Sequence, residues 1–215
     1  MSKNFEDTIL ALSTGSLRAA TALIRISGNS ASRTAGILGF KLPKQRIASV
    51  AVLKDGVRKL DEAVVLFFRG PRSYTGEDVV ELHVHGGRTV IEAVIHVLKR
   101  QDGFRIAEPG EFTKRAVLNG KMDLTKAEGI NDLIHAETEA QRVQSFAQVD
   151  GALSETAGDW REKAIKIAAH VEAYIDFPEE EIPENILTGM GSEMGQLISD
   201  IEKGLDDGRR GEILR

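Results

Sequence analysis

The stretch from Phe67 to Gly87, FFRGPRSYTGEDVVELHVHGG, constrains the fold more than any other part of the sequence. It contains the end of one apolar run, a polar turn, a second run of alternating residues and two glycines. In the second run, a period of two is typical of a strand that buries one face. The apolar face has Val80, Leu82 and Val84, and the polar face has Glu81, His83 and His85.

Gly86 and Gly87 then precede an amphipathic pattern, which predicts a helix directly after the strand. The apolar positions of this helix are Val90, Ile91, Val94, Ile95 and Leu98. The free amide groups at the start of a helix favour anions. The polar face of the strand and the start of the helix are therefore predicted to form the floor of a ligand site.

Glu81 has three interpretations from its residue pattern. A carboxylate on a half-buried strand can accept two parallel hydrogen bonds from the amino edge of a heterocycle. It can equally be an exposed carboxylate on the polar face of an edge strand. Together with His83 and His85 it can also ligate zinc, although no further ligand motif accompanies these residues.

The first part of the chain alternates short strands with short helices, which predicts an α+β domain over residues 1–120. Strands are expected at Thr8–Leu12, Ala19–Ile26, Ile47–Leu53, Ala63–Phe68 and Phe104–Ala107, and helices at 30–38 and Glu111–Leu118. Lys54-Asp55-Gly56 is typical of a hairpin turn between two of these strands.

The remaining residues, 121–215, predict an all-α domain. Thr125 to Glu128 reads as a capping box at the start of a helix. One or two long helices follow over Glu139–Ile175, with Gly151 and Gly158 as weak points, and a last helix over Gly189–Asp207. Phe177-Pro178 is expected to end the long run, Glu179 to Glu181 to form an acidic connection, and Trp160 to lie in a core or interface.

The composition excludes several classes of protein. The 215 residues include no cysteine, so no disulfide framework is possible. The first residues lack the pattern of a signal peptide, and no apolar run reaches the ~20 residues of a membrane span, so we expect a cytoplasmic protein without a membrane partner. The net charge of −5 argues against broad electrostatic binding of nucleic acid, except through a local basic patch.

Four segments, in order, resemble the MnmE/TrmE family of tRNA modification GTPases. They are LIRISG from Leu23, RGPRSYTGEDVVELHVHGG from Arg69, RIAEPGEFTKRAVLNGKMDLTKAEGINDLIHAET from Arg105, and IDFPEEEI from Ile175. The resemblance covers most of the chain, and its motifs are long. It implies an N-terminal domain with the folate-binding fold of aminomethyltransferase-type proteins, followed by an incomplete helical domain.

The resemblance also implies a function. Members install a carboxymethylaminomethyl-type group at C5 of the wobble uridine, position 34, of tRNA, together with an FAD-dependent partner protein. The N-terminal domain forms a homodimer and binds 5-formyltetrahydrofolate or methylenetetrahydrofolate as the one-carbon unit. Family motifs place Arg25 and Lys121 in the folate site, and the residue pattern of the strand adds Glu81 as a third candidate. From their charges, Glu81 would read the amino edge of the pterin, while Arg25 and Lys121 would orient the rest.

Two departures from the family pattern matter. Relatives commonly have a loop like TPPGxGG where this chain has Ser13 to Ala20, so the ligand contacts of this loop are open. The phosphate-binding motif GxxxxGK[ST] is absent; the nearest string, RAVLNGKM from Arg115, lacks its first glycine and its final hydroxyl residue. We therefore expect that the GTPase domain, with its GTP, Mg²⁺ and K⁺, is missing and that this chain does not hydrolyse GTP.

Two alternatives to this interpretation stay open. One is a stand-alone folate-binding protein that transfers one-carbon units, against which no obvious nucleophile or acid–base pair is found; no catalytic residue is predicted. The other is a dimerisation platform whose ligand site is impaired by the altered loop.

Overall fold

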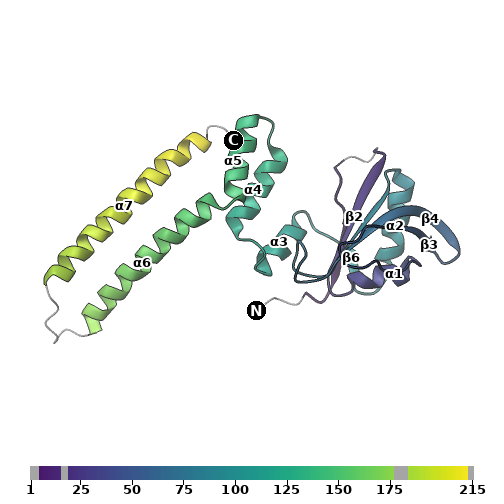
Figure 1. The fold of residues 1–215 in the computed structure, drawn as a ribbon, viewed down its shortest axis with the longest axis horizontal. Helices are drawn as coiled ribbons and strands as arrows, with labels where there is room; N and C mark the ends of the chain where they lie inside the picture. The colour runs from purple at the N-terminus through teal and green to yellow at the C-terminus, as the bar shows by residue number, and fades with distance from the viewer. Residues whose placement is uncertain (1–4, 16–18, 177–183, 213–215) are drawn as a thin grey trace. The chain divides into compact units, whose positions relative to one another are not determined.

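The structure is a computed structural model that describes residues 5–15, 19–176 and 184–212 (Figure 1). The chain divides into two compact units, Met1–Met122 and Asp123–Arg215. Lys121 belongs to the first unit because its backbone amide donates to Ala116 O at 2.8 Å and its ammonium to Pro71 O at 2.9 Å. Of the predicted features, Phe177-Pro178 and Glu179 to Glu181 lie outside the described residues.

The first unit contains a six-stranded mixed sheet. Its strands are β1 (Thr8–Leu12), β2 (Thr21–Ser27), β3 (Ser49–Asp55), β4 (Arg58–Phe68), β5 (Val79–His85) and β6 (Phe104–Ile106). They lie in the order β3-β4-β5-β2-β1-β6, and all neighbours are antiparallel except β1 and β6. The helical elements are a 3₁₀ turn at Ala31–Arg33, α1 (Thr34–Ile37), α2 (Arg88–Lys99) and α3 (Glu111–Leu118) (Figure 1).

One face of the sheet forms the hydrophobic core. The apolar residues predicted for β5, namely Val80, Leu82 and Val84, are all buried there. The apolar stripe of α2 packs into the same core through Ile91, Val94, Val97 and Leu98. The opposite face, which we call the open face, therefore presents the alternate residues of the same strands, Glu81 and His83 among them.

Strand and helix bounds agree with the sequence patterns where the alternation is clear. Thr8–Leu12 and Glu111–Leu118 form as predicted. Strand β4 begins at Arg58 rather than Ala63, because charged residues obscure the alternation at its start. Gly56, at φ 58°, allows the tight turn that places Asp55 opposite Arg58.

The second unit is helical, as predicted. It contains α4 (Leu124–His135), α5 (Glu139–Val149), α6 (Ala152–Asp176) and α7 (Glu184–Glu212). The predicted capping box at Thr125 is wrong. Asp123 is the N-cap of α4, because its carboxylate accepts the Lys126 backbone amide at 2.7 Å. Among the described helices, none combines the length and apolar character needed to cross a bilayer.

The two glycines expected to weaken the long helical run behave differently. Gly151 separates α5 from α6 at φ 96°, whereas Gly158 lies inside α6. Trp160 of α6 packs against α7 at Gly204, where an added Cβ would lie 2.6 Å from the indole ring. Trp160 is therefore part of the α6–α7 interface.

A candidate ligand site on the open face of the sheet

Arg25 and Glu81 lie side by side at the centre of the open face. They are register partners on the antiparallel strands β2 and β5, and Arg25 Nε donates to Glu81 Oε1 at 2.9 Å. Their side chains are 24% and 15% exposed. Two residues that are far apart in the sequence thus form a half-buried ion pair that a ligand can still reach.

Aromatic rings flank the Arg25 guanidinium. Its Cζ lies 5.4 Å from the ring centroid of Tyr74 and 5.7 Å from that of Phe112, distances typical of cation–π contacts. The Tyr74 hydroxyl bonds to Thr113 Oγ1 at 2.9 Å, which fixes the ring against α3. Among the described residues, no hydrogen-bond partner occupies the two terminal nitrogens of Arg25 or the second oxygen of Glu81.

Lys121 lies beside the loop that carries Tyr74, which we call the 69–78 loop. Its ammonium donates to Pro71 O at 2.9 Å. Asn119, in the same turn, donates to Thr75 O at 2.8 Å. Within the described residues no hydrogen bond or ion pair joins Lys121 to Arg25 or Glu81. The structure thus brings two of the predicted site residues into contact and places the third against the loop that covers them.

Arg115 of α3 holds the 69–78 loop in place through Glu77. This side chain is fully buried, and its guanidinium donates to Glu77 Oε1 at 3.1 Å, to Asp7 Oδ1 at 2.6 Å and to Glu111 Oε1 at 3.1 Å. Ser27 of β2 in turn donates to Glu77 Oε2 at 2.7 Å. A buried network therefore joins α3, the loop and the strand that carries Arg25.

The network also lowers the pKa of two of its carboxyl groups, those of Glu111 and Asp7. Hydrogen bonds from Arg105 to Glu111, at 2.5 and 2.7 Å, are the main cause that lowers the pKa of Glu111 to about 2. Burial opposes ionisation of Asp7, but hydrogen bonds from Arg105 and Arg115 outweigh it and lower its pKa. The same bonds, led by the one to Glu111, raise the pKa of Arg105. All these groups are charged at neutral pH.

Sequence reasoning did not single out Arg105, Glu111 and Arg115. They lie in the quoted motif from Arg105, but nothing in local spacing shows their partners. The sequence signal for this network is two arginines and a glutamate in and near a short amphipathic helix.

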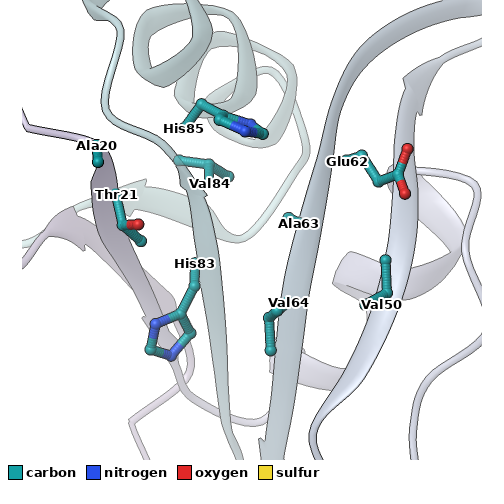
Figure 2. A pocket seen from close by; sticks show the side chains of 9 residues that line it. All are labelled: Ala20, Thr21, Val50, Glu62, Ala63, Val64, His83, Val84 and His85. Carbon is teal, nitrogen blue, oxygen red and sulfur yellow. The ribbon is translucent and has the colours of Figure 1, made fainter.

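The two histidines of β5 differ in their surroundings. His85 is 71% exposed, and its Nδ1 lies 2.7 Å from Asp61 Oδ1. Burial opposes ionisation of Asp61, but hydrogen bonds from the backbone amide and ring of His85 lower its pKa. His83 points away from His85 (Figure 2), and its Nε2 is buried without a hydrogen-bond partner among the described residues.

His83 lines a hollow of about 540 Å³ where β4 and β5 separate (Figure 2). Its other walls are Ala20, Thr21, Val50, Glu62, Ala63, Val64, Val84 and His85. Within the described residues no group of three His, Asp or Glu side chains is placed to hold a metal ion. Of the three residues in the zinc interpretation, Glu81 bonds to Arg25 and His85 to Asp61.

The Ser13 to Ala20 loop is described only in part, since residues 16–18 lie outside the described residues. Ser13 N donates to Leu23 O at 2.7 Å, and Leu23 N donates to Thr14 Oγ1 at 3.4 Å. At the other end of the loop Ala19 O approaches Gly86 so closely that an added Cβ would lie 2.0 Å from it. Gly86 is therefore required where the loop meets the end of β5.

Comparison with known proteins accounts for both units. Residues 8–121 match the family model described as GTP-binding protein TrmE N-terminus, and residues 124–215 match the MnmE helical domain. The chain belongs to the MnmE family of tRNA modification GTPases. The two MnmE matches meet close to the division between the two units of the structure.

Individual relatives carry names that agree with the family. The tRNA modification GTPase MnmE of Anaplasma marginale is 50% identical over 211 residues, which are 97% of this chain and 47% of the relative. That of Caulobacter vibrioides is 48% identical over 97% of this chain and 47% of the relative. The mitochondrial 5-taurinomethyluridine-[tRNA] synthase subunit GTPB3 of Danio rerio is 45% identical, over 98% of this chain and 43% of the relative. The chain spans about half the length of these relatives.

Proposed function

We propose that this chain binds a tetrahydrofolate one-carbon donor, 5-formyltetrahydrofolate or methylenetetrahydrofolate, for the modification of wobble uridine in tRNA. The observation that carries the proposal is the Arg25–Glu81 pair on the open face. An exposed surface pair usually contributes little to stability. The Arg25–Glu81 pair is half-buried, has aromatic rings around its cation and keeps polar atoms without a partner among the described residues. These features are better explained by a binding site than by a role in stability.

The donors and acceptors of the pair match the chemistry of a pterin. The free carboxylate oxygen of Glu81 accepts hydrogen bonds from an amino edge, and the terminal nitrogens of Arg25 donate to carbonyl oxygens. The rings of Tyr74 and Phe112 provide flat apolar surface beside them.

Lys121 supplies a cation at the edge of this site. It is exposed, and its ammonium is held at Pro71 O. An ammonium bonded to one carbonyl keeps two further donors, which suits the carboxylate of a folate tail. The 69–78 loop, supported by Arg115 and Asn119, carries Tyr74 and contacts the Lys121 ammonium through Pro71 O.

Homodimerisation through the first unit is part of the proposal. The open face exposes apolar side chains of β3 and β4, with Val50 68% and Val64 38% exposed. These two valines are register partners, so they form one contiguous apolar area at the edge of the sheet. A second copy of this chain is the partner we propose for it.

The remaining activities of the family belong, in this proposal, to the whole protein. GTP hydrolysis, with Mg²⁺ and K⁺, requires the part of the relatives that this chain does not span, because the chain has no phosphate-binding loop. An FAD-dependent partner protein and tRNA complete the reaction. This chain alone is expected to release no phosphate from GTP.

Calorimetric titration of the chain with 5-formyltetrahydrofolate tests the proposal. We expect saturable binding that Arg25→Ala, Glu81→Ala and Lys121→Ala each weaken, by about tenfold or more for the two half-buried residues, since a charged hydrogen bond contributes about 1.5–3 kcal/mol. The matched controls are Arg58→Ala, Glu92→Ala and Lys99→Ala, which remove the same residue types from exposed positions in other parts of the unit.

The outcomes separate the proposal from its alternatives. If the Glu81 variant loses no more affinity than Glu92→Ala, the pterin assignment is wrong. If the folded wild-type chain forms dimers but binds no folate, the chain is a dimerisation platform. One-carbon transfer to an acceptor by this chain alone would instead identify a stand-alone transfer enzyme.

A further inference from the structure

The charge of this chain is divided unequally between its two units. Residues 1–122 carry 19 Lys and Arg and 12 Asp and Glu, a net charge of +7. Residues 123–215 carry 9 and 21, a net charge of −12. The overall value of −5 therefore conceals a cationic first unit, and a charge asymmetry of this kind points to a polyanionic partner.

Three arginines of the first unit gather at the tip of the 69–78 loop. Arg69 and Arg72 are joined by a turn in which Arg72 N donates to Arg69 O at 3.1 Å. Arg46, from a distant segment, donates from Nη2 to Arg72 O at 2.6 Å. All three are exposed, and we call them the arginine turn. The ammonium of Lys121 reaches Pro71 O in the same turn.

The backbone of Arg46 is held in a conformation that arginine rarely adopts. Its φ is 63°, and of the described residues other than glycine it alone has a positive φ. This left-handed conformation is strained for a residue with a Cβ. Its amide donates to Phe67 O at 2.8 Å, and its guanidinium lies 5.7 Å from the ring centroid of Phe68. The strained residue is the one whose guanidinium bonds to Arg72 O at the loop tip.

No carboxylate of the described residues forms an ion pair with Arg46, Arg69 or Arg72. The two carboxylates of the same loop have other partners. Glu77 bonds to Arg115 and Ser27, and Asp78 Oδ1 accepts the Gly70 amide at 2.9 Å. Within the described residues the two carboxylates of the loop thus have hydrogen-bond partners, whereas the three arginines form no ion pair and can bind an external anion.

We propose that the arginine turn binds the phosphate backbone of the RNA substrate. Arginine is suited to phosphate because its planar fork donates parallel hydrogen bonds. Phosphate contacts position an RNA without reading its sequence. The turn lies on the loop that carries Tyr74 and contacts Lys121, so RNA held there is next to the candidate folate site. The inference rests on the proposed function for its choice of RNA as the polyanion.

The test uses Arg46→Gln/Arg69→Gln/Arg72→Gln and a fluorescent, unmodified tRNA transcript with uridine at the wobble position. Anisotropy titrations run from about 50 to about 200 mM salt, where the logarithm of the binding constant falls linearly with that of salt. We expect the variant to bind about tenfold more weakly at low salt and the slope to fall by about 2 to 3, close to one for each lost phosphate contact.

The matched control is Arg58→Gln/Arg88→Gln/Arg100→Gln, which removes the same charge from three exposed arginines at the start of β4 and at the two ends of α2. It should keep the wild-type affinity and slope. Folate affinity should be unchanged in both triple variants, which also shows that both are folded. Arg69→Gln alone provides a variant that removes no hydrogen bond, ion pair or ring contact within the described residues, and we expect it to reduce the slope by about 1.

Several results would overturn the inference. These are wild-type affinity in the triple variant, an equal loss in the control, and no tRNA binding by the wild-type chain. Unchanged RNA binding with weaker binding of a polyglutamylated folate would assign the turn to the folate tail instead. By contrast, a wild-type chain that binds tRNA through the turn but binds no folate would refute the proposed function and leave this inference standing.

Discussion

Arg115 and Glu77 form an ion pair inside the first unit, with Nη1 3.1 Å from Oε1 and side chains 0% and 8% exposed. Glu77 belongs to the 69–78 loop and Arg115 to α3, so the pair fixes the loop against the helix. The same guanidinium bonds to Asp7 and Glu111 and lies 4.4 Å from the ring centroid of Phe5. The position of Tyr74 over Arg25 therefore depends on a residue outside the site.

Replacement of Arg115 is predicted to be the most damaging single change in this network. Arg115→Met removes the cation and leaves Glu77 and Glu111 buried without it, which typically costs about 3–5 kcal/mol. Urea unfolding should show this loss. The exposed pair of Arg88 with Glu92 provides the control, because Arg88→Met should cost less than about 1 kcal/mol. Equal losses of unfolding free energy in the two variants would show that the network stabilises the chain no more than an exposed ion pair does.

Acid is predicted to weaken the first unit through Glu111. The pKa of this carboxyl is about 2 in the folded chain against an ordinary value of 4.5. Its contribution is therefore complete above pH 4.5 and is lost as pH falls from 4.5 towards 2, for a total of about 3 kcal/mol. The free energy of unfolding, measured through this window, should fall less steeply in Glu111→Gln. If the unfolding free energies of wild type and Glu111→Gln fell in parallel with pH, the loss could not be assigned to Glu111.

Some of these relationships are readable from the sequence and others are not. The alternation in β5 predicted which face is buried, because a strand repeats every two residues wherever it lies. Separate motifs point to Arg25 and Glu81, and no sequence pattern predicts that β2 and β5 are neighbours. The network around Arg115 joins residues up to 108 positions apart and leaves no local signal. The cap of α4 was misjudged because Asp123 and Thr125 both suit that position, and only the backbone decides between them.

Tyr74 is predicted to affect folate binding through its ring more than through its hydroxyl. Its centroid lies 5.4 Å from Arg25 Cζ, and its hydroxyl bonds to Thr113. Tyr74→Ala removes the ring and should weaken 5-formyltetrahydrofolate binding by about tenfold, since such a contact contributes about 0.5–2 kcal/mol. Tyr74→Phe keeps the ring and should bind within about threefold of wild type. Calorimetry on both variants gives the comparison, and the opposite order would assign the role to the hydroxyl.

Gly76 is predicted to couple loop geometry to Lys121. An added Cβ would lie 3.3 Å from the Lys121 side chain and 3.1 Å from Asn119 Cβ, at φ 82°. Gly76→Ala should therefore lower both stability and folate affinity. Gly56→Ala has similar backbone strain, at φ 58°, but nothing within 4 Å of its Cβ. It should lower stability alone, so equal folate affinities in the two variants would exclude the coupling.

Val50 is predicted to lie in the contact between two copies of the chain. It is 68% exposed on the open face of β3, where a charge would be buried without a partner in a dimer. Val50→Asp should shift the chain from dimer towards monomer in analytical ultracentrifugation. Val57→Asp adds the same charge at an exposed valine in the turn of the same hairpin, and it should leave the dimer intact. Comparison of the two variants separates burial in an interface from the general effect of an added charge, because both valines are exposed within a single copy. Dimers of undiminished strength in Val50→Asp would place the contact elsewhere on the first unit.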